Sequence, residues 1–453
     1  MSPQKLPLKE TKWRWTALVI INLMVLGSFM TLEGPQPIET QIKQKLGVGE
    51  SEYSMLYSFW ALPSIITPFF GGYLIDRFGI RPMTIAFGLA VTVGQFIYTY
   101  GGYSLNFSVM LFGRVVYAFG TDPINVAQIF FTNKWFEGKE LGLAMSITGA
   151  MFGIGRGLNS FITPILYEIS GSITVPMLFG ALMCAMGLGM IFYMVKIDEE
   201  DDRREVQMDP HYLMKVKGGE QVSLMDMKYF KPIVWMLIVN FAVIHGYTLC
   251  FNAFANDFYH VRYGFTNVEA GIIISMCFVF FALSGILCGK LIDSKGKRAT
   301  IMLYNSVLGV FCFVYFFLFP TSHRSLTTII PQILLGAQQG NAEAAIYTSL
   351  PLTLQEKYLG TGYGLFFVVE NILVLIMPSM AAYFKEAGTS ETSDGYFGLL
   401  VYFFIWSIVC VGIGAQLFYE DKKTGAVLDN TITMGEHEEG RELLNKKKIV
   451  ETE

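Results

Sequence analysis

Residues 72–81 read Gly72-Tyr-Leu-Ile-Asp76-Arg77-Phe-Gly79-Ile-Arg81, and residues 289–298 read Gly289-Lys-Leu-Ile-Asp293-Ser-Lys-Gly296-Lys-Arg298. Both segments have a Gly-x-Leu-Ile-Asp core, followed by a glycine and an arginine at the same spacing. Each directly follows a long apolar run. A charged, glycine-containing segment that recurs in this way indicates two related halves within one chain.

The composition around these segments is that of a membrane protein. Of the 453 residues, 53% are hydrophobic and only 15% are charged, whereas soluble domains carry about 25% charged residues. The apolar runs match a hydrocarbon core about 30 Å thick. In the first half we expect helices near 15–34, 53–75, 82–101, 106–133, 140–167 and 173–195. In the second half we expect them near 232–258, 267–292, 299–319, 326–353, 359–384 and 395–419.

This pattern predicts an all-α membrane protein with twelve transmembrane helices in two six-helix halves. The expected parts are a cytosolic N-terminus (1–14), a first half (15–195), a cytosolic linker (196–231), a second half (232–419) and a disordered cytosolic tail (420–453). Basic residues concentrate in the loops on the side of the N-terminus, which places both termini in the cytosol. The first apolar run is expected to be retained as a membrane helix rather than cleaved as a signal peptide.

The two repeated segments resemble the signature loop of the major facilitator superfamily, which lies between helices 2 and 3 and again between helices 8 and 9. The resemblance implies alternating access and a conformational role for the loop residues, whose Asp and Arg make ion pairs and interact with helix ends. Arg114, within residues 112–120, resembles a second family motif linked to coupling or gating. The expected gating residues are Gly72, Asp76, Arg77, Gly79, Arg81, Arg114, Gly289, Asp293, Gly296 and Arg298.

A narrower resemblance is carried by residues 34–43, 126–128, 135–141, 263–265 and 359–364. Together they resemble the major facilitator superfamily domain-containing protein 1 group, which contains lysosomal dipeptide transporters. The resemblance implies a dipeptide uniporter that exports its substrate to the cytosol. Animal members of the group work with a glycosylated single-span accessory protein, so such a partner is implied here, and a homodimer stays open.

Two ionisable residues on the fourth and fifth helices are the first candidates for contact with the substrate. At about 1.5 Å per helical residue, Asp122 and Arg156 lie roughly 22 and 29 Å from the turn that joins their helices, which is near mid-membrane. Asp122 would hold an ammonium group and Arg156 a carboxylate. The alternative is an ion pair that only locks the two helices together.

Further ionisable residues lie, by residue count along their helices, at mid-membrane depth or at the outer rim. Charge inside the membrane is costly unless it faces a partner or a cavity. Glu343 and Glu370 could bind a cation or carry a proton, and His245 could titrate near neutral pH. For His245 the alternative is a satisfied packing residue. Glu33, at the non-cytosolic end of the first helix, could attract cations or be a solvated helix end.

The predicted tail contains Glu439-Gly-Arg-Glu-Leu443-Leu444, which resembles an acidic dileucine sorting signal and favours a lysosomal or other acidic compartment. We expect no cofactor, no metal site and no nucleic-acid partner, and no arrangement of residues suggests an enzyme. Two other functions stay open. One is a proton-coupled organic-anion or sugar carrier of the same fold, and the other is a non-transporting membrane receptor or scaffold.

Overall fold

The computed structural model describes residues 6–32, 34–208, 227–228, 230–318, 326–387, 389–390, 393–394 and 396–430. Almost all of these residues are helical. One antiparallel pair of two-residue strands, β1 (Thr389–Ser390) and β2 (Ser393–Asp394), is the exception. The predicted all-α class is therefore confirmed.

Twelve long helical segments, counted within the described residues, follow the predicted order. The first six are α1 (Trp13–Leu32), α3 with α4 (Glu50–Ser64 and Thr67–Phe78), α5 (Ile80–Tyr103), α6 (Phe107–Phe136), α7 (Leu141–Ser170) and α8 (Thr174–Met208). The next six are α10 (Pro232–Tyr263), α11 (Asn267–Lys295), α12 (Arg298–Leu318), α13 (Ile329–Thr353), α14 (Leu359–Ala387) and α15 (Tyr396–Lys423). The short helices are η1 (Leu8–Glu10), η2 (Gln36–Ile38), α2 (Glu39–Leu46), η4 (Leu326–Thr328) and η5 (Glu356–Tyr358).

Ten of these segments are long and apolar enough to cross a membrane. The two that fall short are α6 and α13, which carry polar side chains along their length. Arg114, Asp122 and Gln128 lie on α6, and Gln338 and Glu343 lie on α13. Polar residues on membrane helices usually face a partner or a cavity rather than lipid. The two helices of lowest hydropathy are therefore the two best placed to carry function.

The structure differs from the sequence prediction at two helices. The helix expected over 53–75 is broken at Ile65 and Ile66, because Pro63 and Pro68 each lack the N–H group that would continue the hydrogen-bond ladder. The sixth helix continues to Met208, so the first part of the predicted linker is helical rather than a loop.

The chain forms two compact units. Each consists mainly of one half of the sequence and also includes a short segment of the other half. The first comprises Met1–Trp135, Ile147–Lys231 and Leu354–Met380, and the second comprises Phe136–Ser146, Pro232–Thr353 and Ala381–Glu453. The start of α14 therefore belongs with the first half of the sequence, and the start of α7 belongs with the second.

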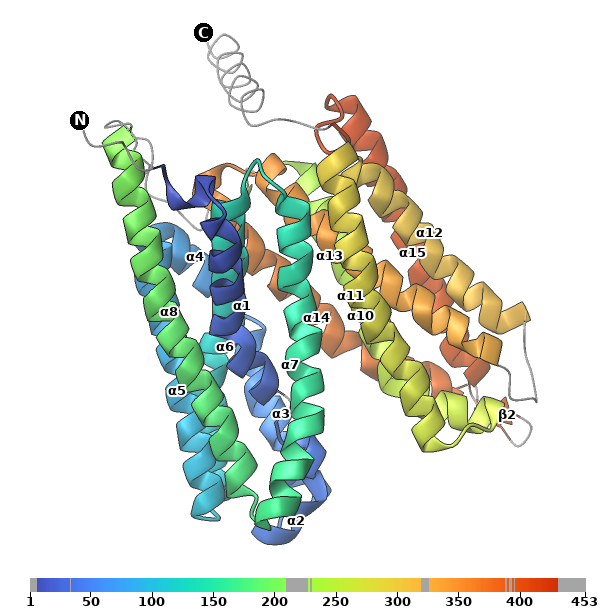
Figure 1. Ribbon diagram of the computed structural model, residues 1–453. Helices are drawn as coiled ribbons and strands as arrows, with labels where there is room; N and C mark the ends of the chain where they lie inside the picture. The colour runs from blue at the N-terminus through green and yellow to red at the C-terminus, as the bar shows by residue number, and fades with distance from the viewer. Residues whose placement is uncertain are drawn as a thin grey trace. The chain divides into compact units, whose positions relative to one another are not determined.

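In the first unit, α8 packs against both α1 and α5 (Figure 1). A separate apolar cluster joins η2 and α2 to the long helices through Ile38, Ile42, Leu56 and Met110. This cluster fixes the segment that follows α1.

In the second unit, aromatic rings fill the space between α10, α12 and α15. The Phe251 ring centroid lies 5.8 Å from that of Phe313, 5.6 Å from that of Phe316 and 5.5 Å from that of Phe403. The pairs with Phe313 and Phe403 are edge-to-face, a geometry that adds to the stabilisation from burial itself.

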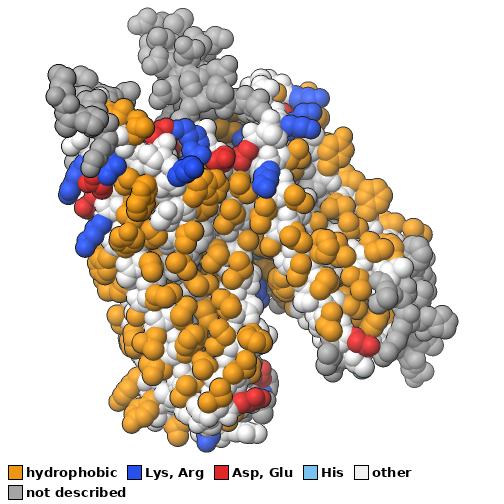
Figure 2. Space-filling view, in the orientation of Figure 1, with side chains coloured by type: hydrophobic (Ala, Val, Ile, Leu, Met, Phe, Trp, Pro, Cys, Tyr) orange, Lys and Arg blue, Asp and Glu red, His pale blue; other side chains and the backbone are white. Residues whose placement is uncertain are grey.

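The outer surface of the helices is apolar. Figure 2 shows hydrophobic side chains over the sides of the helices and charged side chains concentrated towards the helix ends. Phe161, Leu287 and Leu318 are each more than two-thirds exposed. Apolar surface this extensive would be unfavourable in water and is matched by a hydrocarbon phase.

A glycine contact between α5 and α6 gives the first prediction. A methyl group added at Gly94 would overlap the backbone of Tyr117, whereas one added at Gly189 on α8 would meet no atom within 4 Å. We expect Gly94→Ala to destabilise the protein by about 1–3 kcal/mol through overpacking. Gly189→Ala is the control and should leave the melting temperature in detergent nearly unchanged. Equal melting temperatures for the two variants would contradict the close packing of α5 and α6.

Candidate functional site

The break between α3 and α4 creates a polar position in an apolar region. Pro68 has no N–H group to donate to the carbonyl of Ser64, four residues earlier. Nδ2 of Asn371, on α14, donates to that carbonyl instead, at 2.7 Å. A backbone group freed by proline must find such a partner when no water is present. Asn371 therefore ties α14 to the end of α3.

Asp122 lies beside this break on α6. Its side chain is only 8% exposed, and its carboxyl group interacts with the Ser64 hydroxyl, the Asn371 amide and the charge of Glu370. Among the described residues, neither the Ser64 hydroxyl oxygen nor Oδ2 of Asp122 has a partner within hydrogen-bonding geometry. Glu370, on α14, is equally buried at 8% exposure. Two buried carboxyl groups thus share one site within the first unit.

The structure does not bring Asp122 and Arg156 together as an ion pair among the described residues. Arg156 is partly exposed on α7, and its guanidinium carbon lies 5.1 Å from the ring centroid of Phe152. The alternative of an ion pair that locks α6 to α7 gains no support from this geometry. The role of Arg156 in substrate binding stays a prediction.

The other predicted substrate-binding residues lie in the second unit or outside the described part of the chain. His245 and Glu343 belong to the second unit. The ring of His245 is buried and stacks on Phe241 with centroids 4.9 Å apart, whereas Glu343 is partly buried on α13. Four predicted residues lie outside the described part of the chain: Glu33, Glu439, Leu443 and Leu444.

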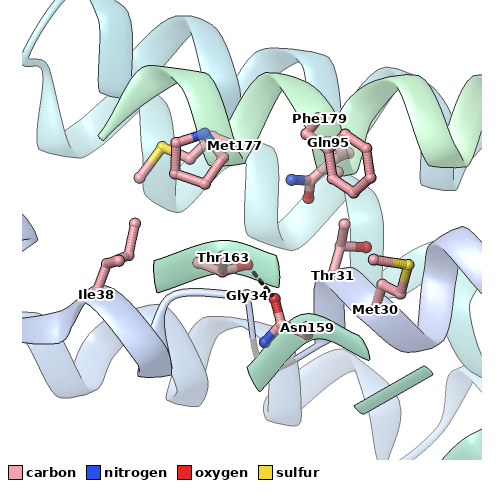
Figure 3. Close-up of a pocket in the computed structure, with 11 residues that line it drawn as sticks. Met30, Thr31, Gly34, Ile38, Gln95, Asn159, Thr163, Met177 and Phe179 are labelled. Atoms are coloured by element: carbon pink, nitrogen blue, oxygen red, sulfur yellow. Dashed lines mark hydrogen bonds between the residues drawn. The ribbon is translucent and has the colours of Figure 1, made fainter. Parts of the chain in front are cut away.

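A small cavity in the first unit is lined by polar residues that the sequence did not single out. Figure 3 shows Thr31, Gln95, Asn159 and Thr163 around it, with Oγ1 of Thr163 donating to Oδ1 of Asn159 at 2.7 Å. Its volume of about 20 Å³ is enough for a single water molecule. A search restricted to charged residues passes over uncharged side chains such as Gln95 and Asn159.

The first signature loop caps the start of another helix. Oδ1 of Asp76 accepts a hydrogen bond from the backbone N–H of Gly360 at 2.9 Å, and Oδ2 accepts from the N–H and the hydroxyl of Thr361, both at 2.6 Å. These are the second and third residues of α14, whose first-turn N–H groups have no partner within the helix. A methyl group at Gly72 would overlap the Gly360 carbonyl, so this contact requires glycine.

The second signature loop repeats this arrangement. Oδ1 of Asp293 accepts from the N–H of Gly142 at 2.6 Å, and Oδ2 accepts from the N–H of Leu143 at 2.9 Å. These are again the second and third residues of a helix, here α7. Gly289 approaches the carbonyl of Gly142 as Gly72 approaches that of Gly360. The repeat of Leu-Gly at 141–142 and 359–360 was the available sequence signal for these partners.

The arginines of the first loop have partners other than Asp76. Arg81 donates through Nε to Asp198 on α8 at 2.7 Å and also pairs with Asp202. Lys134 and the indole nitrogen of Trp135, at the end of α6, reach the same Asp198 carboxylate at 2.8 and 3.0 Å. Arg77 instead donates to the hydroxyl of Tyr73 at 2.8 Å.

Arg114 is fully buried and binds backbone carbonyl groups. It donates to Thr31 O at 3.1 Å, Leu32 O at 2.7 Å and Leu56 O at 3.1 Å. Thr31 and Leu32 end α1, where the carbonyls of the last turn carry partial negative charge. Arg114 therefore joins the end of α1 to α3 and α6.

Comparisons with known proteins agree with this architecture. A model of the Major Facilitator Superfamily matches residues 17–378. The human lysosomal dipeptide transporter MFSD1 is 28% identical over 415 residues, which cover 88% of this chain and 84% of that protein. A solved structure of the proton:xylose symporter XylE gives a TM-score of 0.72 at 11% identity, covering 94% of this chain and 98% of the other. The human organic anion transporter MFSD10 gives 0.65 at 14% identity, covering 90% and 99%. The two structural likenesses concern the fold alone.

The charge network at the end of α8 gives the second prediction. Asp198 is fully buried and, together with Asp202, offsets the charges of Arg81 and Lys134. Asp198→Asn should destabilise the protein by about 3 kcal/mol, because it leaves only Asp202 to offset the two cations. Its neighbour Glu199 has a side chain that is 46% exposed and lies 4.0 Å from Arg203. Glu199→Gln is thus the matched control, and we expect it to change the melting temperature little. A loss of stability in both variants, or in neither, would contradict the assigned role of Asp198.

Proposed function

This chain belongs to the Major Facilitator Superfamily, and from that premise we propose that its substrates are dipeptides. The superfamily membership and the membrane helices describe a transporter of small molecules. The proposal of a dipeptide is supported by the similarity to lysosomal dipeptide transporters over most of the chain. It is also supported by the chemistry of the site around Asp122.

The observation that carries the proposal is the buried Asp122 carboxyl group with a free oxygen beside Glu370. A buried carboxylate needs a cation or a proton to offset its lost hydration. No lysine, arginine or histidine among the described residues interacts with Asp122. The ammonium group of a peptide is a cation that can donate to three acceptors. Asp122 and the Ser64 hydroxyl offer oxygen atoms for it, and Glu370 adds negative charge.

Arg156 would hold the carboxylate end of the dipeptide. It lies on α7, a different helix from Asp122, and is partly exposed. In this proposal the two residues stay separated so that the substrate, rather than a direct ion pair, joins them. His245, Glu343 and Glu33 stay in the proposal as predicted substrate-binding residues.

We further propose that the protein is a uniporter of a lysosomal or similar membrane, with both termini in the cytosol. Degradation of proteins inside such a compartment releases peptides there. Export to the cytosol would therefore run down the concentration gradient of the peptides. The tail segment with Glu439, Leu443 and Leu444 would serve as the sorting signal. A glycosylated accessory protein and a homodimer belong to the same proposal and are testable by native mass measurement.

Binding to the purified protein gives the third prediction. A dipeptide at about 100 times its dissociation constant stabilises the folded state by about 2.7 kcal/mol, which should raise the melting temperature by a few degrees. The same dipeptide with an acetylated N-terminus lacks the ammonium group and should give no shift. Single amino acids, sugars and organic anions complete the panel at two pH values.

Variants of the two carboxyl groups give the fourth prediction. Asp122→Asn should weaken dipeptide binding by about 30-fold or more, the loss typical of a buried charge pair at an interface. Glu370→Gln should weaken it less, because only the charge interaction changes. If only anions or sugars stabilise the protein, the proposed dipeptide substrate is wrong and the substrate belongs to one of those classes. If binding requires low pH, proton coupling is favoured over uniport. Unchanged binding and transport in Asp122→Asn would exclude this site.

A further inference from the structure

The two signature loops share a glycine but differ in what surrounds it. Gly79 and Gly296 both have positive φ, +90° and +68°, so each turn requires glycine for its backbone. A methyl group at Gly79 would meet no atom within 4 Å. At Gly296 it would lie 2.7 Å from the carbonyl oxygen of Asn430 and 3.0 Å from that of Asp429. The second loop is therefore covered by the chain that follows α15, whereas the first has open space at this position.

The covering segment, Thr424–Asn430, is here called the strap. The backbone N–H groups of Lys297 and Arg298 donate to the carbonyls of Asp429 and Leu428, both at 3.1 Å. The carboxylate of Asp429 accepts from the N–H of Thr300 at 2.9 Å and also from its hydroxyl. The strap thus supplies acceptors to the first turn of α12, whose own N–H groups have none within the helix.

The start of α12 has a specific need for these acceptors. Its first turn contains no acidic residue, and Lys297 and Arg298 place positive charge where the helix dipole is already positive. Asp429 provides the missing negative charge from 129 positions further along the chain. Loss of a capping side chain of this kind usually costs about 1 kcal/mol.

The strap is anchored by its own contacts. Leu428 is fully buried, and its N–H donates to Oδ1 of Asp421 at 2.9 Å. Asp421 is itself buried, and its carbonyl accepts from the N–H of Ala426 at 2.7 Å. The end of α15 and the strap therefore form one folded piece rather than a loose extension.

Arg298 connects the strap to the gating residue Asp293. Its guanidinium group interacts electrostatically with both Asp293 and Asp429. It also lies 3.5 Å from the Leu428 carbonyl and 3.3 Å from the Thr348 hydroxyl. Without Asp429, Arg298 would be drawn towards Asp293, whose carboxylate caps α7 through Gly142 and Leu143.

We propose that the strap, through Asp429, holds the second signature loop in the geometry in which Asp293 caps α7. Asp429 is a positioning residue in this scheme: it contacts no substrate and acts on the gate through α12 and Arg298. The first loop has a different arrangement, because its arginine, Arg81, forms ion pairs with Asp198 and Asp202, which both lie on α8.

Hydrogen–deuterium exchange on the full-length protein in detergent tests this proposal without a substrate. In Asp429→Ala we expect amide exchange at Lys297–Ile301 to rise about fivefold, the factor that corresponds to a lost helix cap. Exchange at Gly142 and Leu143 should also rise, although these residues lie in another helix. Glu420→Ala is the control, because the Glu420 side chain approaches Lys423 at 3.9 Å, and the Glu420 contact with the strap residue Thr424 runs through the backbone carbonyl, which alanine keeps.

A second pair of variants keeps the test decisive if Asp429→Ala misfolds. Gly296→Ala and Gly79→Ala each place a methyl group at a position with positive φ, but only the methyl group at position 296 would contact the strap. Faster exchange at Gly142 and Leu143 in Gly296→Ala, and not in Gly79→Ala, would support the proposal. A change confined to α12 and the strap, with Gly142 and Leu143 unaffected, would overturn it and leave the strap as a simple helix cap.

Discussion

The structure depends on an aspartate carboxylate placed at the first turn of a helix from elsewhere in the chain. Asp76 binds the start of α14, and Asp293 binds the start of α7. In each case two backbone N–H groups with no partner in their own helix meet the two oxygens of one carboxylate. The contact needs no charged partner, because the helix terminus itself supplies partial positive charge. The composition of the two compact units follows from these contacts, since each unit includes the helix start that its aspartate binds.

The candidate site lies at the break between α3 and α4, where the regular hydrogen bonding of the helix is interrupted. Pro68 frees the Ser64 carbonyl, and Asn371 satisfies it. Asp122 lies beside both, and its Oδ2 has no hydrogen-bond partner in the part of the chain that the structure describes. A protein selected for stability alone would fill this position with apolar residues, since a buried carboxyl group is costly. Asp122 and Glu370 therefore place a cost in stability at the break, and the proposed binding of a substrate ammonium group by Asp122 would offset it. Asn371 and Glu370 are neighbours on α14. A movement of this helix would therefore change both the hydrogen bond from Asn371 to Ser64 and the distance between the Glu370 and Asp122 carboxyl groups.

The sequence was sufficient for the helices but only partly sufficient for the contacts between them. Apolar runs gave most spans to within about five residues, because the thickness of a bilayer fixes their length, but the end of the sixth helix at Met208 lies well beyond its apolar run. The break at Ile65 was missed, although Pro63 and Pro68 were visible, because two prolines can also be tolerated in a continuous kinked helix. Asp122 and Glu370 were identified one by one from their depth, but their proximity depends on how α6 and α14 pack. The expectation that Asp122 and Arg156 bind opposite ends of a substrate rested on depth alone and stays a prediction, because depth does not specify the direction in which a side chain points.

The two signature loops are alike in sequence and unequal in structure. Asp76 receives three hydrogen bonds, one of them from the Thr361 hydroxyl, whereas Asp293 receives two, since Leu143 takes the place of that threonine. The weaker of the two caps is also the one next to the strap. A hydrogen bond to a carboxylate contributes about 1.5–3 kcal/mol, so a missing third donor is a large difference between otherwise matched contacts. Support from Asp429 would reduce that difference. The proposed strap therefore makes the two carboxylate contacts more nearly equal in strength.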